Sequence, residues 1–322
     1  MRRSHEAAAP SRVVRGFVCA CGLAAALAAG RTVRAQDAVQ PPSQPSFRAS
    51  SSLVVLNTTV AEQDGRLVAG LPQDRFAVFD NDRPQPIALF SNEDMPVTVG
   101  LVVDASFSMR PKIGEVIGGA SRFARVSNPD DEVFAIAFNE RVRDPLEGHA
   151  FVHAGDVSAL EQALEALVPD GETGLYDAML AALDRLDTGS WPRKALVVLS
   201  DGGDNASAAT LNDVLARARR SNAAIYTIGL FDADDRDRNP GVLKTLSEMT
   251  GGVRYLPASP GIVIQDCERI ARDIRSGYTI GFEAPSADGA YHRLRVDIVN
   301  PRDAHMNVRT RAGYLAPIGA RP

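Results

Sequence analysis

Short apolar runs alternate with segments of helical periodicity through the centre of this 322-residue chain. Apolar side chains recur every three or four residues in several segments between Ile113 and Ile274, which predicts a series of amphipathic helices. Apolar runs before and between them predict strands at Val97–Val103, Val133–Phe138, Ala195–Leu199 and Ala224–Ile228. Strands that alternate with helices in this way pair in parallel, because each helix returns the chain to the start of the next strand. The centre is therefore predicted to be a Rossmann-like, doubly wound α/β domain.

The pattern on either side of this centre is typical of β structure. Upstream, alternation and turn residues predict strands at Leu53–Ala61, Phe76–Phe79 and Ile87–Phe90, with turns at Asp64–Gly65 and Asp80–Asp82. Downstream of Gly277, a strand is predicted at Tyr278–Phe282, and another contains Leu294, Val296 and Ile298. Neither flank is long enough to enclose a core alone. We therefore expect the flanks to pair as a small β domain into which the α/β domain is inserted.

The first 35 residues have the layout of a secretory signal peptide. Four arginines precede an apolar run from Phe17 to Gly30, and small residues around Ala28 and Ala35 suit cleavage. A retained membrane anchor is the alternative, but this run is shorter than the ~20 residues that span a bilayer. Lipid attachment at Cys19 or Cys21 is disfavoured because little apolar sequence precedes them. The expected segments are 1–35 signal peptide, 36–50 flexible linker, 51–95 first β part, 96–277 α/β domain and 278–317 second β part.

Cleavage after Ala35 would remove six arginines and one glutamate, and would change the net charge from −5 to −10. An acidic chain of this kind is not expected to bind nucleic acid nonspecifically. Cys267 would be the one remaining cysteine, so no internal disulfide is possible after processing. We therefore expect an exported protein, periplasmic, in the cell envelope or secreted, with no membrane span after cleavage.

Asp104, Ser106 and Ser108 form a D-x-S-x-S motif directly after the strand predicted at Val97–Val103. Oxygen side chains in a loop that leaves the carboxyl end of a strand can converge on one hard cation, and open α/β sheets bind ligands at that edge. The alternative is that the three residues only cap the next helix and stabilise a turn.

Two further segments favour the metal site. Thr173 lies in a glycine-flanked loop that runs into a helix, and Asp201 follows the strand predicted at Ala195–Leu199. Asp204, after two glycines, is compatible with a supporting role near a metal or with a solvated turn carboxylate.

This order of motifs, D-x-S-x-S, then T-G-L-Y-D, then S-D-G, resembles the von Willebrand factor type A domain and its metal-ion-dependent adhesion site. The resemblance covers about residues 96–277, and the flanks, with Asp64–Leu71, Asp74–Asp80 and Arg311–Tyr314, look like a bacterial group of exported relatives. It implies that Ser106, Ser108 and Thr173 bind Mg²⁺ directly, while Asp104 and Asp201 hold it mainly through waters. It also implies that a protein partner supplies an Asp or Glu carboxylate as the sixth ligand; Mn²⁺ is compatible with the same oxygen ligands.

Other candidate sites are weaker. Asp232, Asp234, Asp235 and Asp237 crowd one loop, but an EF-hand starting at Asp232 would place Asp237 where the turn glycine belongs. His149 and His153 have helical spacing, yet glycines bound their segment and favour a loop over a zinc site. Trp191 is expected to cover core, and Cys267 to be a buried, inert thiol. Phe107 suits either a core position or an apolar contact beside the metal.

These observations predict an exported protein-binding module that uses Mg²⁺ to capture a partner carboxylate, and not an enzyme. The alternative is a structural envelope protein in which the metal only stabilises the fold. A hydrolase is disfavoured because no histidine and no known catalytic motif lies in the three motif segments.

Overall fold

The fold is taken from a computed structural model, which describes residues 53–231, 238–299 and 305–318. The predicted signal peptide, the linker, Cys19 and Cys21 lie outside the described residues, as does the aspartate loop at 232–237. None of the helices in the described ranges has the length and apolar character needed to cross a membrane.

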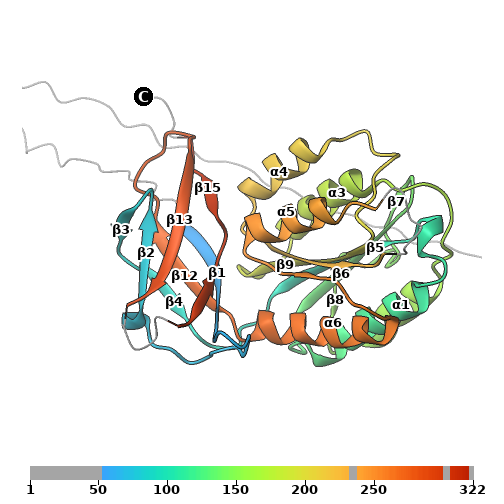
Figure 1. Ribbon diagram of the computed structural model, residues 1–322, viewed down its shortest axis with the longest axis horizontal. Helices are drawn as coiled ribbons and strands as arrows, with labels where there is room; N and C mark the ends of the chain where they lie inside the picture. The colour runs from blue at the N-terminus through green and yellow to red at the C-terminus, as the bar shows by residue number, and fades with distance from the viewer. Residues whose placement is uncertain (1–52, 232–237, 300–304, 319–322) are drawn as a thin grey trace, which may run out of the picture. The chain divides into compact units, whose positions relative to one another are not determined.

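The central sheet has the order β11-β10-β9-β5-β6-β7, with β8 also paired to β6 (Figure 1). Its parallel strands are β5 (Thr98–Asp104), β6 (Glu132–Phe138), β9 (Lys194–Ser200), β10 (Ala224–Gly229) and β11 (Arg254–Tyr255). The short strands β7 (Val142–Arg143) and β8 (Val152–His153) run antiparallel to β6. Every residue of β5 is buried, because helices cover both faces of the sheet. This explains why the sequence of β5 is an unbroken apolar run rather than an alternating one.

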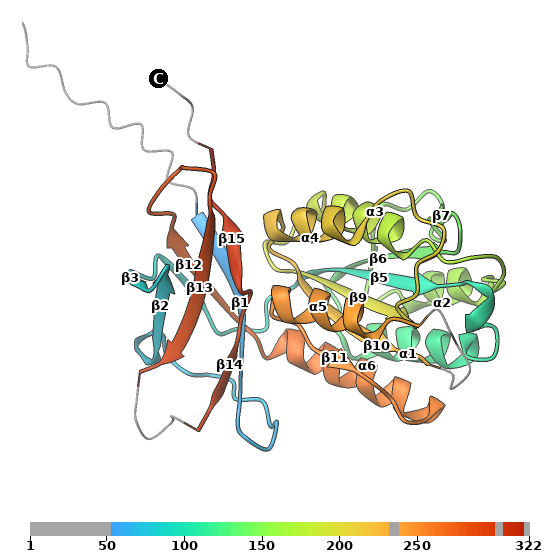
Figure 2. The same ribbon diagram turned by 45° about the horizontal axis from the view of Figure 1, so that its top comes forward.

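Helices lie on both sides of this sheet (Figure 2). One side is covered by α1 (Ile113–Val126), α2 (Val157–Glu165) and α6 (Pro260–Arg275), and the other by α3 (Leu175–Asp187), α4 (Leu211–Arg220) and α5 (Pro240–Thr250). Two separate apolar clusters result, one on each face of the sheet. The prediction of a doubly wound α/β domain is confirmed.

Local sequence fixes several helix ends. The Thr210 hydroxyl and the Asp213 carboxylate form a reciprocal capping box that starts α4. Helix α5 begins with Pro240 behind an Asn239 cap, and ends at Gly251, whose φ of 81° is a left-handed conformation that glycine adopts without strain. These local interactions therefore set the start of α4 and both ends of α5.

The flanking segments form two small antiparallel sheets that enclose a third apolar cluster. The first sheet has the order β14-β1-β12-β4, with β14 Asn307–Arg309, β1 Leu53–Ala61, β12 Tyr278–Glu283 and β4 Leu89–Ser91. The second has the order β15-β13-β2-β3, with β15 Gly313–Leu315, β13 Tyr291–Ile298, β2 Phe76–Asp80 and β3 Arg83–Gln85. Each sheet pairs a strand from before the α/β domain with one from after it, β1 with β12 and β2 with β13. The predicted pairing of the two flanks is confirmed.

The hairpin after β2 differs from the sequence prediction. We expected the strand Ile87–Phe90 to follow the turn at Asp80–Asp82, but the strand that follows this turn and pairs with β2 is β3. Asn81 and Asp82 both have positive φ, 46° and 63°, which is the geometry of a two-residue hairpin turn and returns the chain at once. Leu89 and Phe90 instead belong to β4 in the other sheet, where the Phe90 ring packs against Phe76 and Tyr278.

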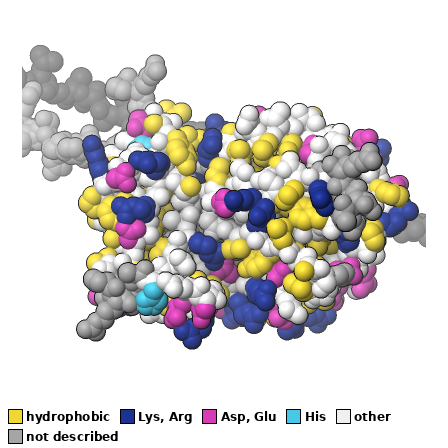
Figure 3. All heavy atoms as spheres, in the orientation of Figure 1, with side chains coloured by type: hydrophobic (Ala, Val, Ile, Leu, Met, Phe, Trp, Pro, Cys, Tyr) yellow, Lys and Arg dark blue, Asp and Glu magenta, His cyan; other side chains and the backbone are white. Residues whose placement is uncertain are grey.

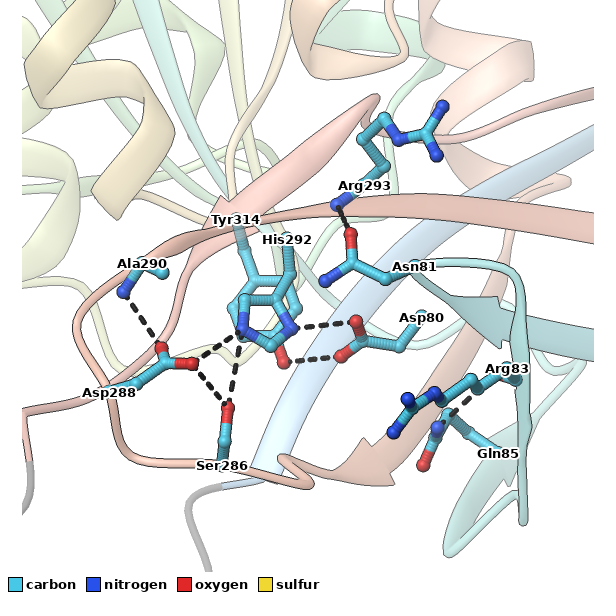
Figure 4. Close-up of polar contacts among 10 residues, drawn as sticks. All are labelled: Asp80, Asn81, Arg83, Gln85, Ser286, Asp288, Ala290, His292, Arg293 and Tyr314. Atoms are coloured by element: carbon cyan, nitrogen blue, oxygen red, sulfur yellow. Dashed lines mark hydrogen bonds and ion pairs between the residues drawn. The ribbon is translucent and has the colours of Figure 1, made fainter.

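A buried polar network joins β2, β13 and β15 within this β unit (Figure 4). One oxygen of Asp80 lies 2.7 Å from Nδ1 of His292, and the other accepts a hydrogen bond of 2.7 Å from the Tyr314 hydroxyl. Nε2 of His292 faces the Ser286 hydroxyl at 3.2 Å and the Asp288 carboxylate at 3.4 Å. The Ser286 hydroxyl itself donates to Asp288 at 3.1 Å. The imidazole thus lies between two carboxylates and ties the 286–290 turn to the sheet.

The His292→Gln variant tests whether this imidazole makes stability depend on pH. Burial by itself lowers the pKa of His292, but the hydrogen bonds and charges of Asp80 and Asp288 raise it above 6.5 overall. A raised histidine pKa stabilises the folded state at low pH, and that contribution is lost as the pH rises through the folded-state pKa. As the pH rises through this raised pKa, urea denaturation should show a loss of stability in the native protein that the variant lacks. The same pH dependence in both proteins would contradict this role.

Candidate metal centre

Asp104 and Asp201 lie together because they follow neighbouring parallel strands. Strand β5 pairs with β9 in a register that sets Val103 beside Leu199, so the carboxyl ends of both strands meet at one edge of the sheet. Asp104 ends β5 and is fully buried, and Asp201 directly follows β9 with 3% of its surface exposed.

Four of the five predicted ligands belong to one chain of hydrogen bonds. The Ser108 hydroxyl donates to Oδ2 of Asp201 at 2.7 Å, and the Ser106 and Ser108 hydroxyls are 3.2 Å apart. The Ser106 backbone N–H donates to Oδ1 of Asp104 at 2.9 Å. The D-x-S-x-S loop and the end of β9 therefore bring two carboxylates and two hydroxyls into one cluster.

Ser200 is a participant that sequence reasoning did not single out. Its hydroxyl donates to Oδ2 of Asp104 at 2.7 Å and accepts a hydrogen bond from the Gly202 N–H at 3.0 Å. The sequence does contain a signal for this role. Ser200 directly precedes Asp201, and a hydroxyl at the end of β9 faces the end of β5. Ser200 fixes the Asp104 carboxylate from the side opposite Ser106.

Thr173 lies in the loop before α3, and the structure anchors this loop to both other motifs. The Phe107 N–H donates to the Gly171 carbonyl at 3.1 Å, and the Asp170 N–H donates to the Ala105 carbonyl at 2.9 Å. Thr173 itself is held by Asn205, whose side-chain oxygen accepts from the Thr173 N–H at 2.8 Å. Among the described residues no hydrogen bond involves the Thr173 hydroxyl, and Thr173 is 8% exposed.

Asp204 holds neighbouring loops in place, which agrees with the supporting role considered for it rather than with a solvated turn carboxylate. Its Oδ2 accepts hydrogen bonds from the Tyr176 N–H at 2.9 Å and from the Ser207 hydroxyl at 2.6 Å. Asp177 in turn accepts from the N–H groups of Ala208 and Ala209. These bonds lock the 204–209 loop to the first turn of α3, the helix that follows Thr173. Asp204 is therefore an anchor of the site and not a solvated carboxylate.

The electrostatics of the cluster favour a cation. Burial, and next the nearby charge of Asp201, raise the pKa of Asp104 to about 6, against the effect of its hydrogen bonds. Two carboxylates at a buried edge repel each other, and a bound cation would relieve that cost. The described part of the chain contains no group of three or more His, Cys, Asp or Glu side chains arranged to hold a metal. The hydroxyl oxygens of Ser106 and Ser108, which lie beside these carboxylates, are of the kind that suits a hard ion such as Mg²⁺.

The structure also shows where the other candidate residues from the sequence lie. Cys267 is fully buried, and burial raises the pKa of its thiol to about 12, as expected for an inert group. His153 lies in the edge strand β8 and His149 in a turn, so the two do not share a helix face. Trp191 is partly buried, and its backbone N–H donates to the Thr98 hydroxyl. Phe107 is 58% exposed, which decides against a core position.

A family model, that of the von Willebrand factor type A (VWA) domain, matches residues 99–258. This range holds all five predicted ligands and lies inside the predicted α/β domain. The chain carries a VWA domain. No curated protein sequence matches the chain significantly.

Solved structures with this fold are distant in sequence. A von Willebrand factor type A protein from Catenulispora acidiphila is 14% identical with a TM-score of 0.51, and the match covers 84% of this chain and 76% of that one. The vWF domain of the type V pili tip protein Mfa5 from Porphyromonas gingivalis is 14% identical (TM-score 0.46, 56% and 95% covered). The PilB minor pilin from Streptococcus sanguinis is also 14% identical (TM-score 0.46, 60% and 64% covered). At such identities the likeness to the first structure shows the fold alone.

The pKa of Asp104 leads to a pH test of metal binding by the VWA domain. Because the folded-state pKa is raised to about 6, the metal-free protein should lose stability as the pH rises from about 4 to about 6. Mg²⁺ needs the deprotonated carboxylate, so adding Mg²⁺ should raise Tm strongly near pH 7.5. Near pH 5 the protein should bind Mg²⁺ about tenfold more weakly, and the rise in Tm should be smaller. The matched control, Asp104→Asn, should show little rise at either pH. A rise in Tm that is equal at both pH values would argue against Asp104 as part of the site.

Proposed function

We propose that this protein is an exported, metal-dependent protein-binding module. In this proposal Ser106, Ser108 and Thr173 bind Mg²⁺ through their hydroxyl oxygens, while Asp104 and Asp201 hold it mainly through waters. Mn²⁺ suits the same oxygen ligands. A carboxylate of a protein partner completes the coordination.

The observation that carries the proposal is the pairing of buried carboxylates with hydroxyls at the end of β5. Asp104 and Asp201 supply negative charge, and the Ser106–Ser108–Asp201 hydrogen bonds hold neutral oxygens beside them. If the direct protein ligands are neutral hydroxyls, they compensate little of the ion's charge in its first shell. The ion therefore favours an anionic group from outside, which makes it part of a binding surface.

Binding is a better account of this site than catalysis. Metal-assisted hydrolysis needs a general base near the bound water, and no histidine lies in the three motif segments. Asp104 is tied by Ser106 and Ser200, which suits a carboxylate that positions an ion rather than one that moves protons.

The proposal places the protein outside the cytoplasm, in the periplasm, in the cell envelope or secreted. It rests on the signal-peptide pattern of residues 1–35. On the face drawn in Figure 3, basic and acidic side chains are interspersed, which suits a protein partner better than a nucleic acid.

Titration calorimetry of Mg²⁺ into the purified protein tests the ligand set. Thr173→Val removes one proposed ligand hydroxyl at nearly constant shape and should weaken Mg²⁺ binding about tenfold or more. Asp104→Ala should abolish binding while helical content stays nearly intact. Thr245→Val, on the exposed surface of α5, is the control and should bind like the native protein.

A second experiment distinguishes a metal that binds a partner from a metal that only stabilises the fold. A partner captured by the immobilised protein should be released by a chelator and not retained by Asp104→Ala. If chelation lowers Tm but leaves the partner bound, the metal is structural and the binding proposal fails. If no variant differs from the native protein in Mg²⁺ binding, the ligand assignment itself is wrong.

A further inference from the structure

An exposed aromatic side chain lies between two of the proposed metal ligands. Phe107 separates Ser106 from Ser108 in the chain, so its Cα is about 3.8 Å from each of theirs. Its side chain is 58% exposed, whereas Met109 in the same turn is fully buried. More than half of a large apolar residue therefore faces solvent at this place.

Phe107 belongs to a small surface that also includes Arg110 and Val168, which we call the Phe107 platform. The Arg110 guanidinium lies over the Phe107 ring at 4.7 Å from its centroid. Arg110 also donates to the Pro169 carbonyl at 3.3 Å, next to Val168, which is 71% exposed. The platform thus offers an apolar surface with one cation, from two loops that adjoin the proposed metal.

The platform is held in place rather than free to collapse. Its two loops are joined by the hydrogen bond from the Phe107 N–H to the Gly171 carbonyl. The buried Met109 side chain anchors the short helix η2 (Phe107–Met109), and the Arg110 N–H bonds back to the Phe107 carbonyl. A ring fixed in this way loses little conformational freedom when a ligand covers it.

The loop on the Thr173 side carries the opposite charge. Asp170 and Glu172 are exposed there, and the Glu172 N–H donates at 3.3 Å to the carboxylate of Glu140, which follows β6 and is paired with Arg141. A strongly acidic ligand would be repelled by these carboxylates even though the ion attracts one of its groups. The surface therefore favours a single carboxylate with an uncharged, apolar neighbour.

We propose that the partner is a protein segment in which one Asp or Glu is followed directly by a bulky apolar residue. The carboxylate meets the ion, and the apolar side chain covers Phe107 and Val168. This inference rests on the proposed function, because it deepens the description of the same site.

Three acetylated and amidated tetrapeptides test the inference on the Mg²⁺-loaded native protein: Ser-Glu-Leu-Ser, Ser-Glu-Ser-Ser and Ser-Gln-Leu-Ser. Chemical shift titration measures the Kd of each peptide. Covering a leucine side chain removes apolar surface from water, so we expect the first peptide to bind about tenfold more tightly than the second. The third peptide, which lacks a carboxylate, should bind much more weakly than the first.

Two variants test whether the preference for the leucine peptide depends on the Phe107 platform. Phe107→Ser should remove most of the tenfold preference for leucine while leaving Mg²⁺ binding and the Kd of Ser-Glu-Ser-Ser unchanged. Leu89→Ser is the matched control, because Leu89 is an apolar residue with 37% exposure in strand β4 of the β unit. It should keep the full preference.

The outcomes distinguish a failure of this inference from a failure of the proposed carboxylate-binding function. Equal affinity for the leucine and serine peptides, or a preference that survives in Phe107→Ser, overturns the role of the platform while the carboxylate site stands. Equal affinity for the glutamate and glutamine peptides overturns the carboxylate-binding function, and the inference with it.

Discussion

The parallel pairing of β5 with β9 is the constraint on which the proposed site depends. Because Val103 lies beside Leu199, the two strands end level and place Asp104 and Asp201 at one buried edge. Ser106, Ser108 and Ser200 satisfy these carboxylates with hydrogen bonds but bring no positive charge. The same pairing that builds the core of the sheet therefore creates a local need for a cation. A fold with these strands in any other register would separate the two aspartates.

The β unit is tied to the α/β domain at the edge opposite the metal site. Arg309 of β14 forms an ion pair of 2.6 Å with the buried Asp273 of α6, and the Asn57 side chain donates to the Asn222 carbonyl at 2.9 Å. The flanks also depend on each other, since β1 pairs with β12 and β2 with β13. An inserted domain whose neighbouring strands pair in this way has its two ends fixed together.

The sequence alone was sufficient to predict those features that local patterns determine. Periodicity located the helices, the apolar run located β5, and the D-x-S-x-S spacing gave the link between Asp104 and its two serines. The missed features depend on which loops meet in space: Asn205 holds Thr173, Asp204 caps the start of α3, and Ser200 faces Asp104. Hydrogen bonds between loops produce no periodic pattern in a sequence, so they cannot be predicted from periodicity. The misplaced hairpin partner of β2 has a similar cause, because the positive φ of Asn81 and Asp82 is set by the turn and not by hydrophobicity.

The central claim is that three loops converge on one cation, and a crystal structure of the protein grown with Mn²⁺ tests it directly. Anomalous scattering from Mn²⁺ would locate the ion without any assumption about its ligands. The account predicts one anomalous peak within bonding distance of the hydroxyl oxygens of Ser106, Ser108 and Thr173, with waters between the ion and the carboxylates of Asp104 and Asp201. A peak elsewhere, or a site at which the Thr173 hydroxyl is not a ligand, would contradict it.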